Sequence, residues 1–109
     1  MKPIRVIIAG GRKFDQEAWA HEKISHMLSK KDLSDMEIVE GGALGADRIG
    51  RNWAKANGVQ FTTFESDWDD ISKPDAVIRT NRYGKQYNAK AGHDRNQDMA
   101  DYATHLILF

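Results

Sequence analysis

The sequence contains no cysteine, only two prolines and no net charge. Without cysteine there are no disulfide bonds, thiolate metal sites or thiol nucleophiles, which fits a reducing compartment. Cations and carboxylates number 16 each, so no global charge attracts nucleic acid or acidic membrane, and any phosphate site must be local. Apolar runs reach only about half a dozen residues, far fewer than the roughly 20 of a membrane helix, and no signal-peptide core is present. We therefore expect a soluble, cytoplasmic protein.

The 109 residues are enough for one domain, which we place at residues 1–109. Short apolar, β-branched segments predict strands at residues 4–9, 36–40, 59–64 and 105–109. Strands that alternate with helices imply right-handed crossovers between parallel strands. The predicted fold class is therefore α/β, a three-layer Rossmann-like parallel sheet of about four strands with flanking helices.

Three helices are expected between these strands. The first runs from a cap at Asp15 to about Lys30, and Asn57-Gly58 ends the second. A capping box at Asp94 to Gln97 opens the third. The residues expected to face inward are Ala20, Ile24, Met27 and Leu28 in the first helix, Ile49, Trp53 and Ala56 in the second, and Met99, Tyr102 and Ala103 in the third.

A long segment without periodicity follows the third strand, and we interpret residues 68–92 as an insertion loop. From residue 79 to residue 95 cations alternate with aromatics: Arg79, Arg82, Tyr83, Lys85, Tyr87, Lys90 and Arg95. This composition is typical of surfaces that contact phosphates and stack on bases. A lid over a nucleotide, a contact with a nucleic-acid strand and a merely solvated loop all remain open.

Two glycine pairs follow predicted strands, at the sheet edge where α/β folds bind ligands. The first is Gly10-Gly11-Arg12-Lys13, in which Arg12 could bind a phosphate through two hydrogen bonds. The second, Gly41 to Asp47, leads into a helix and suits an anion, with Arg48 and Arg51 as further cations. Neither is a dinucleotide GxGxxG motif or a P-loop, so a simple tight turn stays open.

Carboxylates for acid-base chemistry are plentiful, at Glu40, Asp47, Asp67, Asp69 and Asp70. Their proximity cannot be deduced from the sequence, so Glu40 and Asp47 are only weak catalytic candidates. The four histidines lack the spacing of a metal motif, and we expect neither a metal nor another cofactor.

Several segments together resemble the YspA-like members (DUF2493) of the SLOG superfamily, which also includes the Smf/DprA and LOG proteins. They are residues 4–14, residues 39–48, Asp67-Trp68 and residues 91–100, which occur in the family's order. The resemblance implies a Rossmann-like fold with a pocket for a nucleotide or a nucleotide-derived ligand. It also suggests a bacterial or phage protein, located in the host cytoplasm if a phage encodes it. By position, the ligand-binding residues would be Gly10, Gly11, Arg12, Lys13, Gly41, Gly42, Ala43, Leu44, Gly45, Ala46, Asp47, Arg95 and Asn96.

The leading hypothesis is a non-catalytic domain that senses or sequesters such a ligand. Leu44 stands where the family often has a basic residue, and the PGGxGTxxE loop of the LOG enzymes has no counterpart. One alternative is a LOG-like nucleoside monophosphate N-glycosidase (phosphoribohydrolase) that uses Glu40 or Asp47. Another is a protein that binds single-stranded nucleic acid. We expect no membrane partner, but we expect a homo-oligomer that covers apolar surface near residues 106–109.

Overall fold

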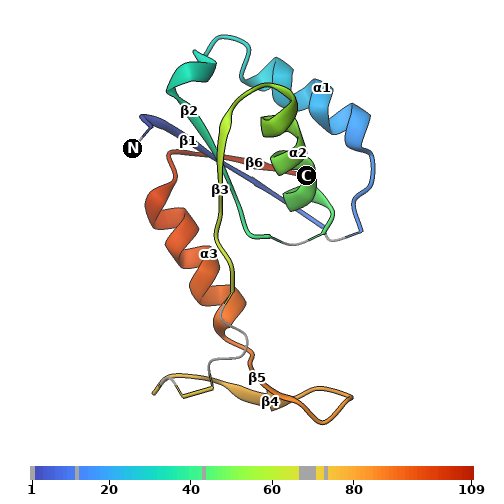
Figure 1. Cartoon of the computed structure of the whole chain (residues 1–109), viewed down its shortest axis with the longest axis vertical. Coiled ribbons are helices and arrows are strands. Elements are labelled where there is room, and N and C mark those ends of the chain that lie inside the picture. The colour runs from blue at the N-terminus through green and yellow to red at the C-terminus, as the bar shows by residue number, and fades with distance from the viewer. Residues whose placement is uncertain (1, 12, 43, 67–70, 73) are drawn as a thin grey trace.

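The computed structural model describes residues 2–11, 13–42, 44–66, 71–72 and 74–109. In chain order the elements are β1 (Ile4–Ala9), α1 (Glu17–Met27), the short 3-10 helix η1 (Leu33–Asp35), β2 (Met36–Glu40), α2 (Ala46–Ala56), β3 (Gln60–Thr63), β4 (Ile78–Thr80), β5 (Gln86–Asn88), α3 (Ala91–Tyr102) and β6 (His105–Leu108). Four strands form one parallel sheet of order β3-β2-β1-β6, and β4 pairs with β5 in a separate antiparallel hairpin. The predicted Rossmann-like α/β fold is confirmed (Figure 1).

The sheet is covered by α1 and α2 on one face and by α3 on the other. Successive side chains of a strand point to opposite faces, so the two faces build separate clusters. The larger cluster includes Val6, Ile8 and Ile38 from the sheet, Ile24 from α1 and Trp53 from α2. The smaller one joins Ile7 and Val39 to Met99 of α3. The predicted three-layer arrangement follows from this alternation.

The order of the strands reverses beside β1. The chain passes from β1 through α1 to β2 on one side, whereas β6 pairs with β1 on the other side. In open α/β sheets ligands bind at the carboxyl ends of the strands near such a reversal. Gly10 follows β1 and Gly41 follows β2, so both glycine loops lie at this edge.

The first two helices differ in detail from the prediction. Asp15 does not cap α1, because the residue before the helix is Gln16 and no side chain caps the helix start. At its other end, α1 stops at Met27 rather than near Lys30. Met27 is 55% exposed, so its predicted place in the core is wrong, whereas Ala20, Ile24 and Leu28 are buried. In α2, Ala56 is exposed and Ala54 is buried instead.

The predicted capping box at Asp94 is wrong, because α3 begins at Ala91. The Asp94 N–H donates to the Lys90 carbonyl, which places Asp94 inside the first turn. The Asn88 side-chain oxygen accepts the N–H groups of Val77 at 3.3 Å and Lys90 at 3.0 Å. These contacts order the chain ahead of the helix, so that it begins earlier than local capping patterns predict.

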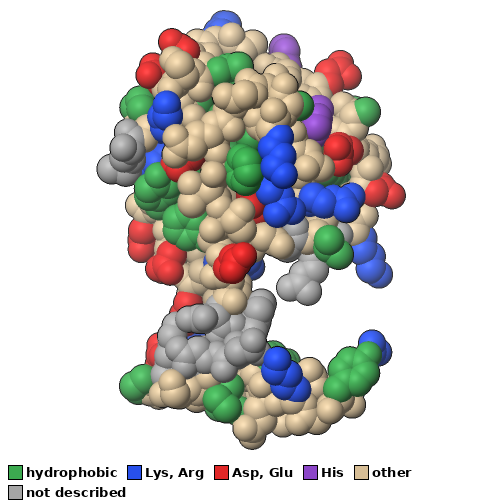
Figure 2. Space-filling view, in the orientation of Figure 1, with side chains coloured by type: hydrophobic (Ala, Val, Ile, Leu, Met, Phe, Trp, Pro, Cys, Tyr) green, Lys and Arg blue, Asp and Glu red, His purple; other side chains and the backbone are tan. Residues whose placement is uncertain are grey.

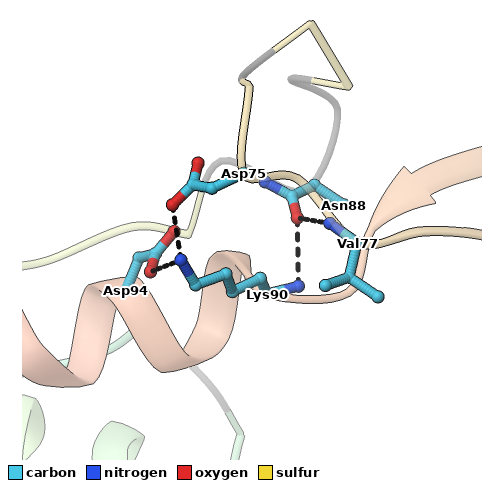
Figure 3. A network of polar contacts seen from close by, with 5 residues as sticks. All are labelled: Asp75, Val77, Asn88, Lys90 and Asp94. Carbon is cyan, nitrogen blue, oxygen red and sulfur yellow. Dashed lines mark hydrogen bonds and ion pairs between the residues drawn. The ribbon is translucent and has the colours of Figure 1, made fainter.

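Part of the predicted insertion loop forms a hairpin, which we call the hairpin arm (residues 74–90). Its turn is held by the Asn81 side chain, which accepts the N–H groups of Tyr83 and Lys85, and Gly84 has a φ of 81°. At its base Lys90 pairs with Asp75 and Asp94 (Figure 3). The arm lies beyond the N-terminal end of α3, away from the sheet (Figure 1).

The last strand, β6, forms one edge of the sheet. Leu106 is 60% and Leu108 is 70% exposed, which agrees with the prediction of uncovered apolar surface here. Self-association through this surface stays a prediction. Over the residues that the structure describes, no helix has the length and apolar character needed to cross a bilayer.

Candidate functional site

The two glycine loops touch each other at the carboxyl edge of the sheet. The Ala46 N–H, at the start of α2, donates to the Gly11 carbonyl over 3.3 Å. A Cβ atom at Gly10 would lie 2.3 Å from the Phe109 carbonyl oxygen and 3.0 Å from the Ala46 Cβ. The loop after β1, the start of α2 and the end of β6 therefore converge, and only glycine at position 10 permits this approach.

Glu40 is fully buried at the end of β2, and both of its carboxylate oxygens have partners. The Gly42 N–H donates to one oxygen over 2.5 Å, and the Thr63 hydroxyl of β3 donates to the other. Gly42 adopts a φ of 76°, a left-handed conformation that favours glycine. Through these two hydrogen bonds Glu40 ties the second glycine loop to β3.

Asp47 and Arg95 clamp Gly41 from two sides. The Gly41 N–H donates to Asp47 Oδ2 over 3.1 Å, and its carbonyl accepts from Arg95 Nη1 over 2.5 Å. A Cβ at Gly41 would lie 2.5 Å from that guanidinium nitrogen and 2.9 Å from Asp47 Oδ2. Glycine leaves the space that this clamp needs. Arg95 belongs to α3, which covers the face of the sheet opposite to α2, and it thus connects α3 to the second glycine loop.

These contacts change the predicted anion site. The N–H groups of Gly41, Gly42 and Ala46 lie in the loop predicted to bind an anion, but they donate to Asp47, Glu40 and the Gly11 carbonyl respectively. An anion at Gly41 or Gly42 would have to displace a carboxylate. Gly45, the residue before α2, has a φ of 75°.

The other predicted ligand residues lie around this edge or outside the described part of the chain. Lys13 and Leu44 are exposed, and so is Arg48, whereas Arg51 is half-buried. Asn96 is exposed, and its Oδ1 accepts from Arg95 Nε over 2.8 Å, so it orients the guanidinium. The predicted residues that lie outside the described ones are Arg12, Ala43, Asp67, Trp68, Asp69 and Asp70.

A second buried carboxylate, Glu37 of β2, anchors the far end of α3. It is 1% exposed and accepts hydrogen bonds from the Tyr102 hydroxyl and, over 2.8 Å, from the Thr62 hydroxyl. The hydrogen bond to Glu37, together with burial, raises the pKa of Tyr102 above its ordinary value near 10. The Arg5 guanidinium lies 4.9 Å from the Tyr102 ring centre. This cluster positions α3, and through α3 it positions Arg95.

Three contributors to the site escaped the sequence-based prediction: Thr63, Gly50 and an aromatic cluster. Thr63 can donate to Glu40 only because β3 pairs with β2 in a register that places the two residues side by side. Gly50 allows α2 to pack closely on β1, since a Cβ there would lie 2.5 Å from the Ile8 Cβ. The rings of Phe14, Trp19 and Phe109 pack together beside the first glycine loop, with ring centres 5.4 to 6.2 Å apart. In the sequence Gly50 could be noticed as a glycine within a helical pattern, but the other contacts have no local signal.

Among the described residues, no three histidine or carboxylate side chains gather as a metal site would need. Comparison with protein families matches residues 4–70, which span β1 to β3 and both glycine loops, to the YspA, cpYpsA-related SLOG family (YAcAr). No curated protein and no solved structure matches the chain. The match covers well over half of the sequence and agrees with the observed fold. The chain therefore belongs to the YspA, cpYpsA-related SLOG family.

Proposed function

We propose that this chain is a single domain that binds a nucleotide or a nucleotide-derived small molecule at the edge formed by its two glycine loops. The observation that carries the proposal is their convergence: Ala46 donates to the Gly11 carbonyl beside the point where strand order reverses. Membership of the SLOG family supports a nucleotide-related function in general.

The phosphate of the ligand would lie at the N-terminal end of α2. Helix N-termini present backbone N–H groups and a partial positive charge, which favour an anion. Arg48 on the first turn of α2 and Lys13 on the first loop are exposed and could add charge. The half-exposed Trp19 lies beside the first loop and offers a fluorescence readout of binding.

The state of the carboxylates favours binding over N-glycosidic cleavage. Glu40 and Asp47 are the candidate acid and base of the LOG-like alternative, but both are buried. Each accepts a hydrogen bond from the backbone of the second glycine loop. A general acid or base must reach the reacting atoms, directly or through one water. The hydrogen bonds of Glu40 and Asp47 to Gly42 and Gly41 support a role for both carboxylates in fixing the conformation of the second glycine loop.

Isothermal calorimetry with nucleoside monophosphates, dinucleotides and cyclic nucleotides tests the proposal, with Gly45→Ala as the variant and Gly58→Ala as its control. The two glycines have similar φ values, 75° and 66°, and lie at opposite ends of α2. Each substitution places a side chain at a positive φ, at a cost of about 1–3 kcal/mol. Gly45 also has a ψ of −127°, so circular dichroism must first show that Gly45→Ala is folded. Only Gly45→Ala should abolish the heat of binding. The proposal fails if the folded protein gives no heat with any of these compounds, or if both variants lose binding equally. Release of free base from a nucleoside monophosphate would favour the enzyme instead.

A further inference from the structure

The hairpin arm (residues 74–90) concentrates positive charge in a chain that has none overall. It carries four cations and one carboxylate, and the rest of the chain balances the excess with an equal negative charge. Lys90 is already engaged by Asp75 and Asp94 at the base of the arm (Figure 3). The other three cations of the arm are Arg79, Arg82 and Lys85.

The outer part of the arm combines exposed guanidinium groups with an exposed aromatic ring. Arg79 and Arg82 are both exposed, and Tyr83 at the turn is 79% exposed. The Arg82 guanidinium carbon lies 5.0 Å from the Tyr83 ring centre. Figure 2 shows open space between the arm and the body of the molecule on one side. A large aromatic side chain in this position has little intramolecular packing to explain it.

The arm is also built firmly enough to present these groups to a partner. Asn88, which is 1% exposed, holds the backbone of both strand ends through its side-chain oxygen. The Asn81 side chain holds the turn, and Lys90 pairs with the first turn of α3. The cations therefore project from a short ordered hairpin.

We propose that the hairpin arm binds single-stranded nucleic acid. Arg79 and Arg82 contact backbone phosphates, and Tyr83 stacks on a base whose face is accessible because it is unpaired. Charge complementarity selects a polyanion, and the exposed ring at the turn selects unpaired bases over a uniformly charged surface. This site is separate from the glycine loops and does not depend on the nucleotide proposed there.

Fluorescence anisotropy of the full chain with a labelled single strand of about 20 nucleotides tests this, because single-strand binding folds cover roughly 4–16 nucleotides. Each phosphate contact adds about 0.7 to the slope of log affinity against log salt on a single strand. The double variant Arg79→Gln/Arg82→Gln should therefore lower the magnitude of this slope by about 1.4. Between 50 and 200 mM salt, the affinity of the wild type should then fall about 7-fold more than that of the variant. Tyr83→Ala should weaken binding about 5- to 150-fold with the slope unchanged.

The matched control is Lys30→Gln/Lys31→Gln, which removes the same charge in the turn after α1. It should leave both the affinity and the slope near those of the wild type. All three arm positions are exposed, so the variants should keep the circular dichroism spectrum of the wild type. The proposal is overturned if the wild type shows no binding at 50 mM salt, or if the control weakens binding as much as the arm variants. It is also overturned if the arm mediates binding only to phosphatidylserine vesicles or only to duplex.

Discussion

Replacing Gly50 by alanine tests how closely α2 packs on the sheet. The new Cβ would lie 2.5 Å from the Cβ of Ile8 and 2.8 and 2.9 Å from its two γ carbons. Carbon atoms in contact normally stay about 3.5–4.0 Å apart. Ile8 is fully buried in β1, and β1 pairs with β2 on one side and β6 on the other. Since the strand is held on both sides, α2 must move away from the sheet by about 1 Å.

Two opposing effects decide the magnitude. Alanine is about 1 kcal/mol better than glycine within a helix. Overpacking of a core costs about 1–3 kcal/mol, and three close contacts with a β-branched residue place this site at the upper end. We therefore expect a net loss of about 2 kcal/mol in the free energy of unfolding, or a melting temperature lower by about 8 °C. The glycine loop at the start of α2 should shift with the helix.

Urea unfolding followed by circular dichroism measures this loss. A double-mutant cycle with Ile8→Ala measures the part of the clash that comes from the two γ carbons of Ile8, because alanine lacks these carbons but keeps the Cβ. Gly50→Ala should then cost less in the Ile8→Ala background than in the wild type. A Gly50→Ala protein as stable as the wild type, or more stable, would refute the close approach of α2 to β1.

Two further predictions concern the elements that position the site. Tyr102→Phe removes a hydrogen bond to the buried Glu37 and should lower the free energy of unfolding by about 1.5–3 kcal/mol in urea. Because the pKa of Tyr102 is raised by this bond, its contribution is present below pH about 10 and is lost as the pH rises through the raised pKa. Alkaline destabilisation should therefore be weaker in Tyr102→Phe, and equal pH profiles would contradict this. Asn88→Ala leaves the N–H groups of Val77 and Lys90 without their acceptor, so limited proteolysis should cut the hairpin arm faster than in the wild type, whereas the exposed Gln86→Ala should change nothing.

The strands of the sheet could be predicted because their signal is local. Residues 4–9 and 36–40 are short apolar runs, and the structure has strands over the same residues. The hairpin arm could not be predicted in this way, because β4 and β5 have three residues each and are largely exposed. Its stability depends on hydrogen bonds that the side-chain oxygens of Asn81 and Asn88 accept from the backbone, and such bonds leave no periodicity in the sequence. The helix starts at Glu17 and Ala91 escaped prediction for a related reason, since no side chain caps either helix.

The sequence by itself determined the α/β class, the placement of glycine loops after two parallel strands and the family resemblance, because each rests on residues that are neighbours in the chain. Only the tertiary structure decided what the polar residues of those loops do. Arg95 reaches the Gly41 carbonyl across 54 positions of sequence, and Thr63 reaches Glu40 across 23. Contacts of this kind depend on strand order and register, which bring distant residues to one sheet edge. They turn the expected phosphate donors of Gly41 and Gly42 into partners of Asp47 and Glu40, and so shift the proposed anion site to the start of α2.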